Sequence, residues 1–152
     1  MKLKVGDSAP LFTLKDQAGT AHTLSQYLGS WVLLYFYPKD DTPGCKAEAC
    51  SIRDSWATFG SVGSVVLGVS VDSVASHAKF VKKYDLPFTL LADEDKQVVK
   101  MYDVQKAFGL IAARTSFLID PEGKIAKIYE SVKPDDHAGE VLADIREMQK
   151  TK

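Results

Sequence analysis

Both cysteines of this 152-residue chain lie in one short stretch, YPKDDTPGCKAEAC, which runs from Tyr37 to Cys50. An ionised thiol can act as a nucleophile or as a metal ligand. Cys45 and Cys50 supply only half of a four-ligand zinc site, and no histidine or acidic pair stands beside them at ligand spacing. The pair therefore favours thiol chemistry over metal binding.

The residues before Cys45 predict the start of a helix. Thr42 is a favourable N-cap residue, and Pro43 suits the first helical position, where its missing N–H removes no hydrogen bond. Cys45 is then the third helical residue, where unpaired backbone N–H groups and the positive end of the helix dipole stabilise a thiolate. We expect Cys45 to be the reactive thiol for this reason.

The helix alone does not stabilise the thiolate enough. An unperturbed thiol is only about 3% ionised at pH 7, and making it roughly 90% ionised requires about 3.4 kcal/mol. A helix terminus contributes at most about 2 kcal/mol. A cation is therefore needed, and Arg114 is the candidate, because the strand that it begins could lie beside a strand at 31–38. Lys39 and Lys46 are nearer in sequence but are expected to point to solvent.

Helical periodicity separates the two thiols. The apolar stripe predicted to face the sheet consists of Cys45, Ala49, Ile52, Trp56 and Phe59. Cys50 lies on a different face, together with charged residues, so we expect it to be nearer water. An asymmetric pair of this kind suggests that one thiol attacks and the other resolves.

The rest of the chain predicts an α/β fold in one domain, residues 1–152. Buried strands are expected at 31–38, 64–71 and 88–93, and helices at 43–59, 73–84, 94–102 and 134–150. A pair of short strands precedes them within 9–24, and a hairpin with a Pro-Glu-Gly-Lys turn lies within 115–131. This order resembles a thioredoxin-like fold with a mostly parallel central sheet, a C-terminal antiparallel hairpin and helices on both faces.

Composition narrows the function classes. The chain is 45% hydrophobic and 26% charged, with a net charge of -1 and no basic run, so we expect no nucleic-acid partner. No apolar segment has the length of a membrane span, and the start MKLKVGDSAP has no signal-peptide core. Two cysteines without an export signal indicate a reducing compartment, and we expect a cytoplasmic protein.

Two acids and three histidines are given no functional role. Asp40 and Asp41 are predicted to be solvated loop residues. His22, His77 and His137 stand in turn or surface-helix contexts and are expected to be inert.

The cysteine stretch resembles that of the peroxiredoxins. Pro38, Thr42 and Cys45 match the motif Pro-x-x-x-Thr-x-x-Cys. The block YFYPKDDTPGC…EAC…RD, the C-x4-C spacing and the later RTSFLID resemble the bacterioferritin comigratory protein, or peroxiredoxin Q, branch over nearly the whole chain. The resemblance implies a peroxidase that uses thiols and needs no cofactor and no metal.

The resemblance also implies a role for each matching residue. Cys45 would attack the O–O bond of hydrogen peroxide or an organic hydroperoxide and become a sulfenic acid. Thr42 and Arg114 would hydrogen-bond the thiolate and the peroxide, while Pro38 shields the site. Cys50 would resolve the sulfenic acid as an intramolecular disulfide, which thioredoxin or a similar dithiol reduces. Such an intramolecular pair needs no second subunit, so we expect a monomer.

Other interpretations remain open at this point. Cys45 and Cys50 could be helix packing residues, and Arg114 a strand-edge charge. A thiol–disulfide oxidoreductase would have the same fold, although it normally carries C-x-x-C at the helix start. A metal-binding or partner-binding module is a third class. The segment 104–113 looks shorter than in many peroxiredoxins. The resemblance therefore does not fix the shape of the substrate pocket's rim, which this segment would form.

Overall fold

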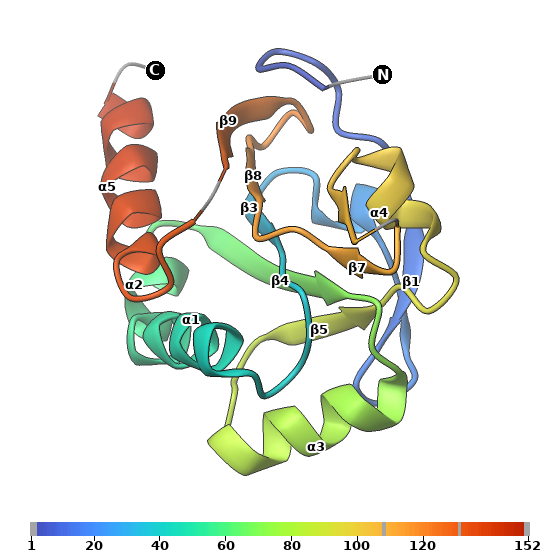
Figure 1. The fold of residues 1–152 in the computed structure, drawn as a ribbon. Coiled ribbons are helices and arrows are strands. Elements are labelled where there is room, and N and C mark those ends of the chain that lie inside the picture. The colour runs from blue at the N-terminus through green and yellow to red at the C-terminus, as the bar shows by residue number, and fades with distance from the viewer. Residues whose placement is uncertain (1–2, 108, 131, 151–152) are drawn as a thin grey trace.

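The computed structural model describes residues 3–150 except 108 and 131. Within this part of the chain, a seven-stranded sheet in the order β2-β1-β5-β4-β3-β8-β9 forms the centre of the molecule (Figure 1). Its strands are β1 (Thr13–Asp16), β2 (Ala21–Thr23), β3 (Trp31–Phe36), β4 (Ser64–Ser70), β5 (Thr89–Ala92), β8 (Ser116–Ile119) and β9 (Ile125–Tyr129).

The central strand β3 explains the shape of the sheet. All six of its residues are buried, as expected for a continuous apolar run that is covered on both faces. It pairs with β4 in parallel and with β8 antiparallel. The thioredoxin-like α/β fold and the C-terminal hairpin are confirmed. Fewer strands run parallel to one another than a mostly parallel sheet would have. Among the described strands, only β3, β4 and β5 are parallel neighbours, and the other pairings are antiparallel.

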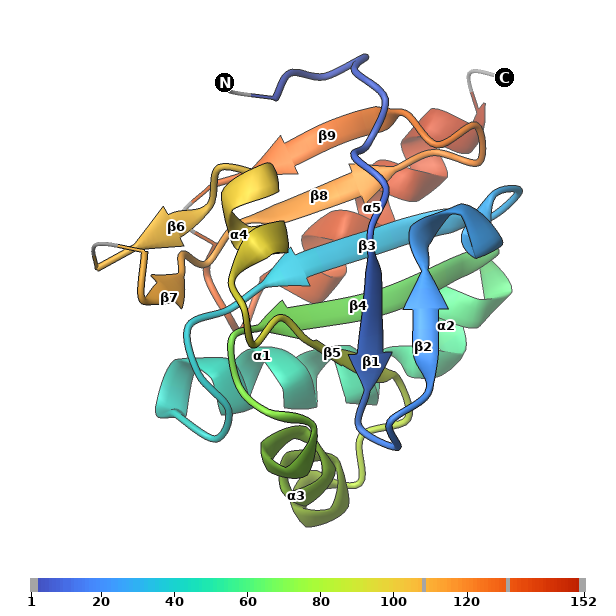
Figure 2. The same ribbon diagram turned by 90° about the vertical axis from the view of Figure 1, so that its right-hand side faces the viewer.

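Helices cover both faces of the sheet, as the sequence predicts. Figure 2 shows α1 (Pro43–Asp54), α2 (Trp56–Ser61) and α5 (His137–Lys150) behind the sheet, and α4 (Gln97–Met101) in front of it. The helix α3 (Val74–Tyr84) contacts β5 and adds Phe80 to the core cluster beneath α1 and α5. Each face of the sheet therefore has its own apolar core.

Several element boundaries differ from the predicted ones. The helix expected over 43–59 is broken at Ser55, whose backbone leaves the helical region at φ -103° and ψ 8°. The helix expected from 134 begins at His137, after a hydrogen-bonded turn at 134–136, and α4 is shorter than 94–102. Two small elements were not predicted: the 3-10 helix Leu24–Tyr27, and a hairpin of β6 (Gln105–Lys106) with β7 (Ile111–Ala112).

Candidate active site

The two thiols lie on one unbroken helix and differ in exposure. Cys45 is the third residue of α1 and is 2% exposed, whereas Cys50 is half-buried, and both are free thiols. Residues five apart on a regular helix have Cα atoms roughly 8.6 Å apart, from its rise and radius. A disulfide requires Cα atoms about 4.4–6.8 Å apart. The structure therefore represents the reduced form, in which the thiols are held apart.

Arg114 reaches Cys45 from the bend that precedes β8. Its Nη1 lies 3.5 Å from the Cys45 Sγ, and its side chain is 21% exposed. Because β8 runs antiparallel to β3, it begins at the edge of the sheet where β3 ends, so Arg114, two residues before β8, lies close to the start of α1. Lys39 and Lys46 are exposed, as expected.

The absence of a side chain at Gly44 makes room for this contact. A Cβ atom at position 44 would lie only 2.7 Å from Arg114 Nη2. Real Cβ atoms do not approach other atoms so closely, so any other residue here would displace the guanidinium. The glycine of the Thr-Pro-Gly-Cys stretch therefore allows the guanidinium to lie beside the thiol.

Glu48 is a site residue that the sequence analysis missed. It is fully buried one turn after Cys45, and its Oε1 lies 3.3 Å from Arg114 Nη1. Its Oε2 has no hydrogen-bond partner among the described residues. Burial raises the pKa of Glu48 to about 7, and the charge and hydrogen bond of Arg114 offset this only in part. The signal available in the sequence was an acid three residues after Cys45, beside the apolar stripe.

Thr42 occupies the predicted N-cap position without capping the helix through its side chain. Its backbone is extended, at φ -86° and ψ 155°, but its hydroxyl donates to the carbonyl oxygen of Lys39 at 2.9 Å. Thr42 is therefore the N-cap residue that the sequence predicts, but the lysine carbonyl and not the helix holds its hydroxyl. Pro38 is half-buried just after β3, at the base of the same loop.

The sequence pattern of the AhpC/TSA family matches residues 5–128, which is most of the chain. The chain belongs to the AhpC/TSA family. The match includes both cysteines and Arg114, so the cluster around Cys45 lies within the shared part of this family.

Two relatives and two solved structures illustrate the likeness to other AhpC/TSA proteins. The chain is 42% identical to peroxiredoxin Bcp of Bacillus subtilis over 154 residues, covering 97% of this chain and 98% of that protein. It is 44% identical to a chloroplastic peroxiredoxin Q of Triticum aestivum over 149 residues, covering 97% and 69%.

Two solved structures have a fold similar to that of this chain over most of its length. A mutant of PrxQ from Xylella fastidiosa aligns with a TM-score of 0.92 at 35% identity, covering 98% of this chain and 99% of that one. The bacterioferritin comigratory protein of Xanthomonas campestris, whose structures are described as giving insight into alkyl peroxide reduction, aligns with a TM-score of 0.87 at 35% identity, covering 93% and 99%.

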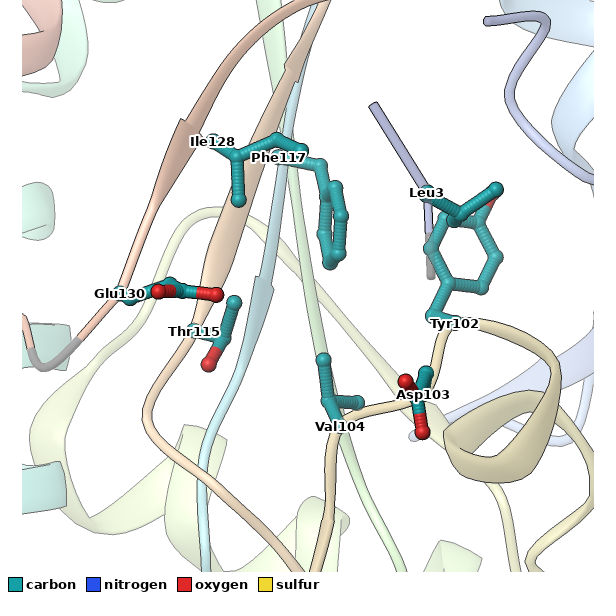
Figure 3. Close-up of a pocket in the computed structure, with 8 residues that line it drawn as sticks. All are labelled: Leu3, Tyr102, Asp103, Val104, Thr115, Phe117, Ile128 and Glu130. Atoms are coloured by element: carbon teal, nitrogen blue, oxygen red, sulfur yellow. The ribbon is translucent and has the colours of Figure 1, made fainter. Parts of the chain in front are cut away.

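Figure 3 shows a pocket of about 270 Å³. It is lined in part by Phe117, which belongs to the core cluster on the face of the sheet opposite Cys45. Its lining residues are Leu3, Tyr102, Asp103, Val104, Thr115, Phe117, Ile128 and Glu130. Thr115 lines this pocket, whereas the preceding residue, Arg114, contacts Cys45 from a bend in the chain. Because no thiol or cation lines it, this pocket is separate from the cysteine site.

Two of the residues expected to be inert on the surface are buried, and so is Asp40. Asp40 is 9% exposed, His77 is fully buried and His137 is 1% exposed, so the expectation of solvated or surface positions is wrong for these three. Each is buried because it finds polar partners: His137 contacts the Ser116 hydroxyl, and His77 contacts Asp40. His22 is half-buried, in contact with Asp16.

Within the described residues, no group of three or more His, Cys, Asp and Glu side chains is arranged to hold a metal ion. No helix among the same residues has the length and apolar character of a membrane span.

Proposed function

We propose that this protein is a peroxidase that reduces hydrogen peroxide and organic hydroperoxides with its cysteine thiols. The observation that carries the proposal is the 3.5 Å contact between Arg114 Nη1 and the Sγ of a thiol in the first turn of a helix. This arrangement brings together a nucleophile and a fixed cation, which a reaction that expels an oxyanion requires.

Two positive groups surround the Cys45 sulfur. Cys45 stands in the first turn of α1, where backbone N–H groups have no partner within the helix, and the Arg114 guanidinium lies beside it. The same guanidinium nitrogen also contacts the buried Glu48 carboxyl group, which helps to hold it in place.

In the first step, the Cys45 thiolate attacks one oxygen of the hydroperoxide. An S–O bond forms, the O–O bond breaks, and Cys45 is oxidised to a sulfenic acid while the peroxide is reduced to an alcohol or water. The departing oxygen takes up a proton, and Arg114 stabilises the charge that develops on it. Thr42 Oγ1 donates to Lys39, so its lone pairs are available to accept a hydrogen bond from the hydroperoxide O–H.

In the second step, the Cys50 thiol attacks the Cys45 sulfur, forms a disulfide and releases water. The unbroken α1 keeps these residues too far apart for this bond, so the helix must unwind first. Thioredoxin or a similar dithiol then reduces the disulfide and restores both thiols. Since both cysteines belong to one chain, a monomer is sufficient, and a thiol cycle of this kind fits the reducing cytoplasm.

The test is a peroxide assay coupled to thioredoxin, performed on the wild type, Cys45→Ser and Cys50→Ser. Cys45→Ser should lose all turnover, whereas Cys50→Ser should react once and then stop as a sulfenic acid that is open to further oxidation. Insulin reduction without peroxide consumption would instead indicate a thiol–disulfide oxidoreductase. Full turnover by Cys45→Ser would refute the proposed role of Cys45.

A further inference from the structure

The loop between β3 and α1 is anchored by a buried acidic side chain. The side chain of Asp40, two residues before Thr42, is only 5% exposed. It accepts hydrogen bonds from the Tyr37 hydroxyl at 2.6 Å and from the Ser76 hydroxyl at 2.8 Å. Its Oδ2 also lies 2.7 Å from His77 Nδ1. The carboxyl group thus ties the loop to the end of β3 and to α3.

The His77 ring is held at both of its nitrogen atoms. Its Nε2 lies 2.9 Å from the carbonyl oxygen of Leu91 in β5, and Nε2 must carry a proton because a carbonyl oxygen only accepts. The contact between Nδ1 and Asp40 requires a second proton, since an unprotonated ring nitrogen and a carboxylate oxygen are both acceptors. The pair therefore forms a buried, hydrogen-bonded link between the loop, α3 and β5.

The backbone of Asp40 is fixed as well. Its N–H donates to Asp72 Oδ2 at 2.8 Å, and the same oxygen accepts from the Ser70 hydroxyl at the end of β4. The next residue, Asp41, has φ +58°, a backbone conformation that residues other than glycine rarely adopt. Its carboxylate accepts from Lys83 Nζ at 2.7 Å. The loop is thus held in one unusual path by contacts on both sides of the turn.

This path decides where the chain enters α1. The Thr42 hydroxyl donates to the carbonyl of Lys39, the residue before Asp40, and the Thr42 carbonyl accepts the N–H of Lys46. A shift of Asp40 would therefore move both the Thr42 hydroxyl and the first turn of the helix, which carries Cys45.

We propose that Asp40 and His77 are positioning residues for the reaction at Cys45. The link between them holds the loop in place, and the loop sets the positions of the Thr42 hydroxyl and of the first turn of α1, which carries the thiol. This inference rests on the proposed peroxidase function. Neither side chain is placed in contact with the peroxide, so both act through the loop.

The two ring nitrogens of His77 can be tested separately. In His77→Asn, the side-chain NH₂ can stand near the place of Nδ1 and donate to Asp40. In His77→Gln, it can stand near the place of Nε2 and donate only to Leu91. The proposal predicts that His77→Asn retains most of the peroxide reactivity, whereas His77→Gln and Asp40→Asn lose about tenfold to a hundredfold, as misplacement of reacting groups does.

The matched control is His137→Gln. His137 is also buried and hydrogen-bonded, but it lies on α5, where its Nε2 contacts the Ser116 hydroxyl. For every variant, three quantities are measured: the urea unfolding midpoint, the second-order rate with hydrogen peroxide, and the rate of Cys45 alkylation by iodoacetamide. Trypsin cleaves after Lys46 and separates the two cysteines, so peptide masses assign the alkylated site.

A positioning role lowers the peroxide rate of His77→Gln without lowering the alkylation rate in parallel, because alkylation does not use the peroxide contacts. A merely structural role would reduce stability in His77→Gln and in the His137 control alike, and would leave the peroxide rates within about twofold of wild type. That result, or equal rates for His77→Asn and His77→Gln, would overturn the inference while leaving the peroxidase intact. If His77→Gln does not fold, Asp40→Asn is compared with the control by the same criteria. A wild type without peroxide reactivity would instead refute the proposed function itself.

Discussion

Replacing Glu48 with glutamine should stabilise the protein, and the gain should grow with pH. The buried carboxyl group has a pKa of about 7 in the fold, compared with an ordinary value of 4.5. An acid whose pKa is higher in the folded state favours folding at low pH and opposes it as the pH rises through the folded value. Glutamine resembles the protonated acid in shape and cannot ionise, so the variant escapes this loss.

The expected size of the effect follows from the two pKa values. The difference between 4.5 and about 7 corresponds to about 3 kcal/mol, because one pKa unit is worth ~1.36 kcal/mol. The gain develops between the two pKa values, so the variant should gain about 1 kcal/mol at pH 5 and about 3 kcal/mol at pH 7. In a chain of this length, the gain at pH 7 corresponds to a rise in Tm of roughly 6–12 °C.

Urea unfolding of the reduced protein at several values between pH 4.5 and 7.5 measures this gain. Titrating groups remote from Glu48 cancel in the difference between the wild type and Glu48→Gln. Glu147→Gln makes the same change at an exposed position of α5 and should stay within about 0.5 kcal/mol of wild type throughout. A stability difference for Glu48→Gln that does not change with pH, or a less stable variant at pH 7, would show that the reasoning about the buried carboxyl group is wrong.

Three further predictions concern Arg114 and the helix that carries the thiols. Arg114→Ala should lower the peroxidase turnover by more than about tenfold, because it removes the cation beside the Cys45 sulfur. Lysine should restore only part of the turnover because it lacks the planar fork, and a wild-type turnover of the alanine variant would contradict this role. Gly44→Ala should reduce turnover, because the added Cβ displaces Arg114 Nη2. The urea unfolding midpoint should stay unchanged or rise, since alanine favours the helix more than glycine does. Full activity of this variant would argue against the steric role of Gly44. Oxidation to the Cys45–Cys50 disulfide should raise amide hydrogen exchange across residues 43–55, whereas an oxidised protein with α1 still protected would show that the bond forms without unwinding.

Local features of the sequence determined much of the site. The Thr-Pro-Gly-Cys stretch predicted the helix start and the position of Cys45 within its first turn, because capping and proline preferences act over a few residues. Helical periodicity predicted that Cys45 is more buried than Cys50, since it reports which face of a helix is apolar. The same local reasoning failed at Ser55, where the helix breaks although the apolar stripe continues.

The partners of these residues were decided by the tertiary structure. Arg114 meets Cys45 because β8 pairs antiparallel with β3 and therefore starts where β3 ends, and this pairing direction leaves no periodic signal in the sequence. Asp40 and His77 are 37 residues apart and look like surface residues in sequence, but each satisfies the hydrogen bonds of the other in the interior. The burial of a polar residue depends on whether the fold brings it a partner. Periodicity reports which face is apolar but does not report that partner.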